Sequence, residues 1–237
     1  MAKQGKLFLI PTVIAAETEN LVLPPDLKTI CDSIDYFLAE NIRTARRCLS
    51  AMKMSKPIQE LNFQELSKKT NAEQINTLMQ PIFQGKDIGV MSEAGCPGIA
   101  DPGARAVAYA HAKGIEVIPL VGPSSIFLAL MASGFSGQSF AFHGYLPIDK
   151  KEKHEAIRTL SENLRKSGQT QIFMETPYRN NPLLEDLIKV LGKNDLLCIA
   201  KNITGKDEMI KTQTIHSWSK NKPDLHKIPC IFLIGNH

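Results

Sequence analysis

The chain of 237 residues is long enough for one large domain or for two domains of roughly 100 to 150 residues each. Its hydrophobic content of 43% and its charged content of 22% are typical of a globular protein and exclude wholesale disorder. The formal net charge of +4 is compatible with a nucleic-acid partner but is too small to indicate one by itself.

Short apolar runs alternate with helical patterns along the chain. The predicted strands are residues 6–10, 87–91, 115–120, 139–144, 170–175, 195–200, 208–215 and 229–235. The predicted helices cover residues 26–39, 43–53, 71–84, 104–113, 124–133, 151–166 and 179–191. This alternation predicts an α/β fold with mixed, mainly parallel sheets, and the last two strands predict an antiparallel addition at one edge.

The stretch VGPSS, at residues 121–125, is the best position for a division of the chain. A complete set of strand–helix units precedes it, and a new series follows it. We therefore expect an N-terminal α/β domain at 1–121 and a C-terminal α/β domain at 122–237, with a ligand cleft between them.

The cysteines and the N-terminus indicate the cellular compartment of the protein. The five cysteines are scattered, without CxxC spacing, and are expected to be reduced thiols rather than a disulfide framework or a zinc site. The start of the chain, MAKQGKLFLIPTVI, has too short an apolar run for a signal peptide. No stretch approaches the ~20 apolar residues that cross a bilayer. We expect a cytoplasmic protein that does not associate with a membrane.

The loop MSEAGCPGIADPG, at residues 91–103, follows a predicted buried strand and precedes a predicted helix. Glycines at such a position allow the backbone to approach a ligand closely, and helix amides there can face it. The length of SEAGCPG favours ligand contact. Asp101 and Pro102 are also explained by helix capping alone.

Three further segments carry polar side chains at the ends of predicted elements. Ser124 and Ser125 either cap the helix that follows or contact a ligand. Glu40 and Arg43 follow the apolar end of a predicted helix, where such a pair is often only a surface ion pair. Glu175 and Arg179 flank the end of a strand, on the side where α/β domains bind ligands.

Several common site motifs are missing from the sequence. GxGxxG after a strand, GxxxxGK[ST], GxSxG and HExxH do not occur, and the six histidines are dispersed. We therefore expect no metal. The residues by themselves predict a two-lobed α/β protein with a cleft for a small molecule.

Three ordered motifs resemble a known family. GVMSEAGCPGIADPGARAV, GIEVIPLVGPSSIFLALMASG and FAFHGYLP resemble the tetrapyrrole methylase superfamily of S-adenosylmethionine-dependent methyltransferases. The resemblance is strongest to the ribosomal RNA small subunit methyltransferase I group, which methylates a cytidine ribose 2′-hydroxyl. LFLIPTVIAA, LAENIR and METPYR are similar to further motifs of that group, although AENIR and the Glu93 and Cys96 positions depart from its usual residues.

The resemblance implies two α/β domains with S-adenosylmethionine in the cleft between them, usually in a homodimer without metal. Carried over by position, it implies a cofactor site made of Ile14, Gly95, Cys96, Ile99, Ser124, Ser125, Met174 and Pro229. It also implies small-subunit rRNA as the partner, with Glu40, Arg43, Glu175 and Arg179 as candidates for catalysis and phosphate contact.

An RNA substrate needs a basic surface. Two basic segments offer one: Arg43, Arg46, Arg47, Lys53 and Lys56, and then Lys150, Lys151, Lys153, Arg158, Arg165 and Lys166. Acids such as Glu152, Glu155 and Glu162 interleave the second segment, which favours an ordinary solvated helix face. Two alternatives stay open: a methyltransferase for a small acceptor such as a tetrapyrrole, and a module that binds the cofactor without catalysis.

Overall fold

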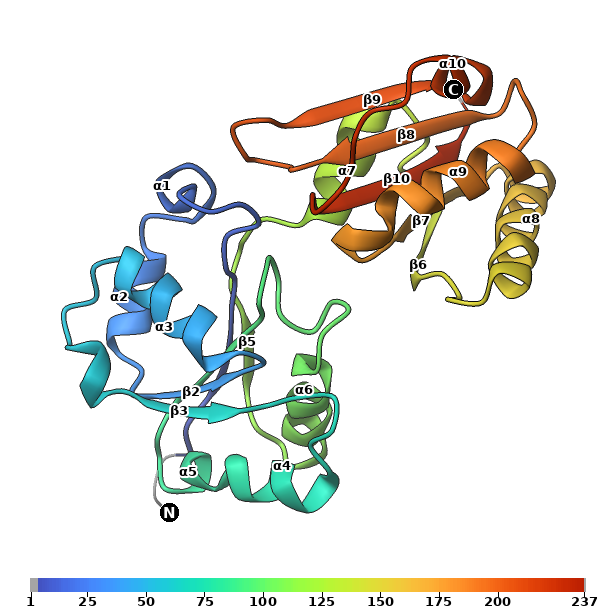
Figure 1. The fold of residues 1–237 in the computed structure, drawn as a ribbon. Coiled ribbons are helices and arrows are strands. Elements are labelled where there is room, and N and C mark those ends of the chain that lie inside the picture. Colours follow the sequence, from blue (N-terminus) through green and yellow to red (C-terminus); the bar gives the residue numbers. More distant parts are fainter. Residues whose placement is uncertain (1–3, 237) are drawn as a thin grey trace. The chain divides into compact units, whose positions relative to one another are not determined.

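The computed structural model describes residues 4–236 (Figure 1). Residues 1–3, the start of the segment considered as a signal peptide, and His237 lie outside this range. The chain divides into two compact units, with the boundary in the sequence between Ser124 and Ser125. Each unit has its own five-stranded sheet.

The first unit alternates strands and short helices. Its strands are β1 (Leu7–Ile10), β2 (Tyr36–Ala39), β3 (Asn62–Glu65), β4 (Ile88–Met91) and β5 (Val117–Pro119). Its helices are α1 (Glu19–Val22), α2 (Leu27–Asp32), α3 (Ile42–Ala51), η1 (Ile58–Glu60), α4 (Ala72–Leu78), α5 (Gln80–Phe83) and α6 (Gly103–Ala112).

The first sheet has the order β3-β2-β4-β1-β5, and its neighbouring strands are parallel. Successive side chains of a strand point to opposite faces, so Phe37 packs with α2 and α3 while Leu38 packs with α4, α5 and α6. Both faces are therefore covered by helices, as is usual for parallel sheets. The carboxyl ends of all five strands lie at one edge.

Gly89 shows how closely the centre of this sheet is packed. A Cβ atom on Gly89 would lie 2.6 Å from Cδ1 of Ile10 and 2.9 Å from Cδ1 of Phe37. Only glycine leaves room for these two side chains over β4.

The second unit begins with a helix. Its helices are α7 (Ser125–Ser133), α8 (Lys150–Ser167), η2 (Pro177–Arg179), α9 (Asn180–Val190) and α10 (Ile215–Lys220). Its strands are β6 (Phe140–Tyr145), β7 (Thr170–Met174), β8 (Leu196–Lys201), β9 (Met209–Thr214) and β10 (Cys230–Gly235).

The second sheet is mixed, with the order β6-β7-β10-β8-β9. β6 and β7 are parallel, whereas β10 and β9 pair antiparallel with their neighbours. Helices α8, α9 and α10 cover one face, where Trp218 is buried and donates its indole N–H to the Leu197 carbonyl at 2.9 Å. Helix α7 covers the other face.

The predicted fold class is confirmed, but several elements differ from the prediction. Residues 36–39, predicted as the end of a long helix, form β2, and residues 62–65 form a strand that was not predicted. The predicted edge addition is wrong for β10, which lies between β7 and β8. β9 does lie antiparallel at the edge. Pairing within a sheet decides the state of such short segments, because four residues carry little periodicity.

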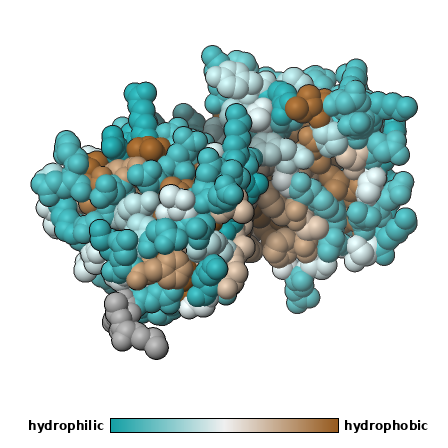
Figure 2. Space-filling model, turned by 90° about the horizontal axis from the view of Figure 1, so that it is seen from below, coloured by the Kyte–Doolittle hydropathy of each residue, from teal (hydrophilic) through white to brown (hydrophobic). Residues whose placement is uncertain are grey.

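Apolar side chains interrupt a mainly hydrophilic surface on the face that Figure 2 shows. The large exposed apolar side chains include Ile99 and Val121 in the first unit and Phe127 and Met131 in the second. None of the helices among the described residues is both long enough and apolar enough to span a membrane.

We predict that Gly89→Ala lowers the free energy of unfolding by about 1–3 kcal/mol, the usual penalty for overpacking a core. Gly137→Ala is the matched control, because a Cβ atom there meets nothing within 4 Å. Urea unfolding of both variants measures the difference. Equal stabilities of the two variants would contradict the close packing of β4.

Candidate active site

Three loops of the first unit meet at the carboxyl edge of its sheet. They follow β1, β4 and β5, which are neighbours in the order β4-β1-β5. Thr12, after β1, and Gly95, after β4, form an isolated bridge with N–H···O distances of 2.9 and 3.2 Å. The Ser92 hydroxyl also donates to the Gly95 carbonyl at 3.0 Å. The parallel register of the strands therefore fixes the glycine-rich loop against the segment that leads to Ile14.

Glycines stand where these loops approach one another. Gly95 has a φ of +74°, and a Cβ atom there would lie 3.1 Å from the Pro123 carbonyl oxygen. A Cβ atom on Gly122 would lie 2.1 Å from Cβ of Pro11. The Cys96 thiol lies 3.4 Å from the Pro123 carbonyl oxygen, to which it donates a weak hydrogen bond. The structure thus brings Gly95 and Cys96 beside the segment that contains Ser124.

Asp101 organises the second half of the glycine-rich loop. Its Oδ1 accepts hydrogen bonds from the backbone N–H groups of Gly98 and Gly103, each at 2.7 Å. Pro102 occupies the N-cap position of α6, so Asp101 binds the start of the helix from one residue further out. Its Oδ2 is buried and has no hydrogen-bond partner. Burial raises the pKa of Asp101, although the two backbone hydrogen bonds lower it in part.

Glu40 lies at the same edge, directly after β2. The sequence prediction placed it after a helix, which is wrong, because residues 36–39 form a strand. Burial raises the pKa of Glu40 above its ordinary value, and the negative charges of Glu93 and Asp101 raise it further. Lys68 lowers it in part. Three carboxyl groups therefore interact at this edge, and Glu40 binds its proton more tightly because of its burial and because of the other two.

None of the ion pairs found for residues 4–236 joins Arg43 to Glu40. Asn41 caps α3 through hydrogen bonds to the backbone N–H groups of Arg43 and Thr44, at 3.0 and 3.2 Å. The Arg43 side chain is exposed on the first helical turn, where a cation is unfavourable. An anionic ligand at this position would remove that penalty.

In the second unit, Met174 ends β7 and Glu175 follows it. The Glu175 side chain is fully buried, and its Oε1 accepts hydrogen bonds from Arg179 Nη2 at 2.7 Å and from the Thr176 backbone N–H at 2.6 Å. Its Oε2 is buried without a partner. Glu175 and Arg179 are therefore brought together in an ion pair that fixes the turn after β7.

Pro229 lies beside the same turn. Ile231, two residues later, is the register partner of Met174 across β7 and β10. Asn180 donates its side-chain N–H to the Ile228 carbonyl at 2.6 Å, and Lys227 donates its backbone N–H to the Pro177 carbonyl at 3.0 Å. Ser125 begins α7, elsewhere in this unit.

The sequence prediction placed Asp101 at the start of the helix, where it binds the Gly103 N–H, but it missed the hydrogen bond from Gly98 to Asp101. It also missed the roles of Thr12 and Ser92 in shaping the loops, and of Glu93 beside Glu40. The proximity of Glu93 to Glu40 was missed because residues 36–39 were not predicted to form a strand. Once β2 is placed next to β4, Glu40 and Glu93 follow neighbouring parallel strands and must end near each other.

Among residues 4–236, neither a buried cysteine nor a cluster of metal ligands forms a second reactive site. Burial raises the pKa of Cys31 and Cys230 to about 12 and that of Cys48 to about 11, so these thiols stay protonated at neutral pH. Burial also raises the pKa of Cys96. Within residues 4–236, no group of three His, Cys, Asp or Glu side chains could hold a metal ion.

Two α/β units with glycine-rich loops at a carboxyl sheet edge, and without a common nucleotide motif, define a narrow class of proteins. The family described as Tetrapyrrole (Corrin/Porphyrin) Methylases matches residues 14–217, and the chain belongs to this family. It is a methyltransferase whose methyl donor is S-adenosylmethionine.

Curated relatives and a solved structure are similar over nearly the whole chain. The ribosomal RNA small subunit methyltransferase I of Thermotoga maritima is 32% identical over 223 residues, which cover 92% of this chain and 94% of that protein. The protein of the same name from Bacillus subtilis is 31% identical over 236 residues, covering 98% of this chain and 76% of that protein. The crystal structure of the methyltransferase CobJ has the same fold, with a TM-score of 0.65 at 15% identity, and covers 98% of this chain and 94% of CobJ.

We predict that Glu40→Gln stabilises the protein more at pH 7 than at pH 4. The folded-state pKa of Glu40 is raised above its ordinary value of 4.5. Its contribution to stability is therefore full below the ordinary value and is lost as the pH rises through the folded value. Glutamine removes this loss.

Urea unfolding at the two pH values measures the effect, and Glu155→Gln, on the exposed surface of α8, is the control. A stability difference between Glu40→Gln and wild type that does not change with pH would show that the carboxyl cluster does not act on Glu40.

Proposed function

We propose that the acceptor of the methyl group is the ribose 2′-hydroxyl of a cytidine in small-subunit ribosomal RNA. The carrying observation is that relatives about a third identical over most of this chain bear the name ribosomal RNA small subunit methyltransferase I. Ribosomal subunits form in the cytoplasm, where we place the protein. The family resemblance also supports a homodimer.

We propose that S-adenosylmethionine is bound by Ile14, Gly95, Cys96, Ile99, Ser124, Ser125, Met174 and Pro229. The observed residues suit such a ligand in three respects. Glycine at position 95 leaves backbone accessible, Ile99 offers an apolar side chain that is 54% exposed, and Asp101 keeps a buried carboxylate oxygen free. The cofactor supplies a methyl group on a positively charged sulfonium, and neighbouring carboxylates favour positive charge.

We assign to Glu40 the role of general base. A ribose hydroxyl is a poor nucleophile at neutral pH, and transfer of its proton to a carboxylate promotes its attack on the methyl carbon. A raised pKa makes a carboxylate a stronger base, and the cause here is burial together with the charges of Glu93 and Asp101. Methyl transfer is an in-line displacement, so the remaining task is to align hydroxyl and methyl group.

We assign supporting roles to the other three candidates. The exposed Arg43 guanidinium is free to contact an RNA phosphate. The Glu175–Arg179 ion pair holds the turn after Met174, and with it one wall of the cofactor site. The ion pair therefore acts by positioning this turn. Glu175 acts directly only where its unpaired Oε2 contacts the reacting groups.

The test of the proposed function is transfer of labelled methyl from S-adenosylmethionine to small ribosomal subunits that lack ribose methylation. We expect label on a cytidine ribose. At saturating cofactor, Glu40→Gln should lower kcat by about 10²-fold or more, the usual contribution of a general base. Glu175→Gln should lower both kcat and stability.

Cofactor binding without transfer to subunits or to naked RNA would contradict an rRNA acceptor and point to a small acceptor or a non-catalytic module. If both Glu40→Gln and Glu175→Gln turn over like wild type while folded, neither residue is catalytic.

We predict that Gly95→Ala weakens cofactor binding about tenfold. Gly114→Ala is the matched control, since both glycines have positive φ, +74° and +66°. Both variants suffer the left-handed strain of about 1–2 kcal/mol. Only Gly95 lies in the proposed site, where an added methyl group would also press on the Pro123 carbonyl. Calorimetric titration with S-adenosylmethionine measures the affinity, and equal affinities of the two variants would contradict the assignment.

A further inference from the structure

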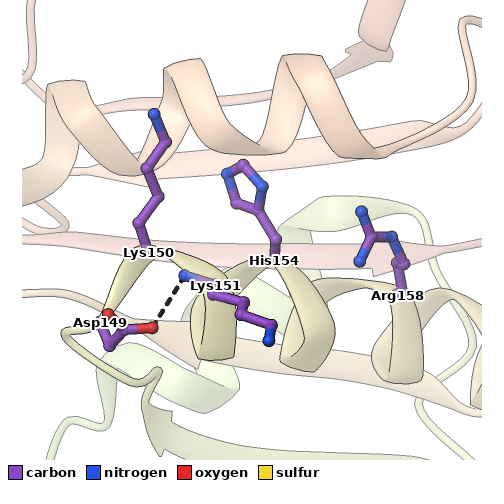
Figure 3. Close-up of a pocket in the computed structure, with 5 residues that line it drawn as sticks. All are labelled: Asp149, Lys150, Lys151, His154 and Arg158. Carbon is purple, nitrogen blue, oxygen red and sulfur yellow. Dashed lines mark hydrogen bonds between the residues drawn. The ribbon is translucent and has the colours of Figure 1, made fainter.

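A hollow in the second unit is lined by charged side chains that the proposed chemistry does not use. It has a volume of about 420 Å³ and is open to solvent. Its lining consists of Asp149, Lys150, Lys151, His154 and Arg158, from the N-cap to the middle of α8 (Figure 3). We call this feature the α8 groove.

Helical spacing places three of the lining residues on one face of α8. Lys150, His154 and Arg158 lie at intervals of four residues, on successive turns of one face, and Figure 3 shows them rising on the same side of the helix. At about 100° per residue, Lys151 and Arg165 fall on this face too, whereas Glu152 falls on the far side. Glu155 and Glu162 border the face, four residues after Lys151 and Arg158, and the ion pair found for Glu162 is with Lys166 at 3.8 Å.

Internal partners neutralise some of these groups but leave three cations. His154 pairs with Asp186 of α9 at 3.0 Å, and Arg165 pairs with Asp195 at 3.4 Å. Burial raises the pKa of Asp186, but hydrogen bonds from His154 and Lys153 outweigh it and hold this pKa below its ordinary value. Lys150, Lys151 and Arg158 have exposed side chains, and none belongs to an ion pair found among residues 4–236.

Asp149, the one acid of the groove, is already occupied. Its Oδ1 accepts hydrogen bonds from the backbone N–H groups of Lys151 and Glu152, at 2.9 and 3.0 Å, and so caps α8. Its charge therefore compensates the helix end rather than the lysines. The helix amides are in turn not available to a ligand, so any anion here is bound by the side chains.

The shape of the α8 groove suits a polyanion better than a small molecule. Small-molecule sites are enclosed, whereas this hollow is open to solvent and bordered by charged side chains. Lys150 and Arg158 lie two turns apart, about 12 Å along the helix, so the unpaired cations can contact more than one anionic group. Lysine and arginine on flexible stems are typical contacts of the nucleic-acid backbone.

We infer that the α8 groove binds the sugar-phosphate backbone of the RNA substrate through Lys150, Lys151 and Arg158. This inference rests on the proposed function and extends it to the way in which the RNA is held. The contacts are made to phosphates, so they position the RNA without reading its sequence.

The test compares two triple variants in binding to purified small ribosomal subunits that lack ribose methylation. Lys150→Ala/Lys151→Ala/Arg158→Ala removes the cations of the α8 groove. Lys193→Ala/Lys211→Ala/Lys220→Ala removes the same charge from exposed positions elsewhere in the unit. The dissociation constant is measured by filter binding over a range of KCl concentrations, with calorimetric cofactor binding as the folding control.

We expect the groove variant to bind at least tenfold more weakly and its plot of log affinity against log salt to be shallower by about 2, since each phosphate contact contributes roughly 0.7–0.9 to the slope. Its kcat at saturating subunits and its cofactor affinity should be unchanged. The control should behave like wild type.

Equal slopes and affinities for the two triple variants would overturn the inference, even if wild type transfers methyl groups normally. Groove-dependent binding by a wild type that transfers no methyl group would instead support the α8 groove and refute the proposed acceptor.

Discussion

The bridge between Thr12 and Gly95 is the constraint on which the candidate site depends. It joins the backbone that leaves β1 to the backbone that leaves β4, and the parallel register of these strands places it at the carboxyl edge. The other features of this edge are held in place relative to this bridge. Gly95 needs its positive φ to make the bridge and also lies close to Pro123, so the loop after β5 is held as well. Asp101 then ties the far half of the loop to the start of α6.

Charge has two different uses in the two units. At the edge of the first sheet, Glu40, Glu93 and Asp101 accumulate negative charge, which raises the pKa of Glu40 and favours a cationic ligand nearby. On the second unit, the α8 groove presents cations to solvent. An enzyme that joins a positively charged methyl donor to a polyanionic acceptor needs both kinds of surface. A modest net charge of +4 therefore conceals strong local differences.

The sequence was most informative where a motif combines glycine and proline with fixed spacing. The loop at 91–103, the strand before it, the helix after it and the α/β class were predictable, because a glycine-rich turn after a buried strand has few structural interpretations. The strand at 36–39 was not, since four apolar residues after a helix continue its pattern, and only pairing with β3 and β4 makes them a strand. The clustering of Glu40 with Glu93 could not be foreseen for the same reason.

Hydrogen exchange of the full chain, with and without S-adenosylmethionine, tests the central claim most directly. If the loops at the carboxyl edge hold the cofactor, backbone amides at residues 11–16, 92–100 and 121–125 should be protected when it binds, together with those around 174–179 and 229. The amides of α8 should exchange at the same rate in both states. Protection that spares the 92–100 loop would contradict the account, because the bridge from Thr12 to Gly95 would then shape a loop that the cofactor does not touch.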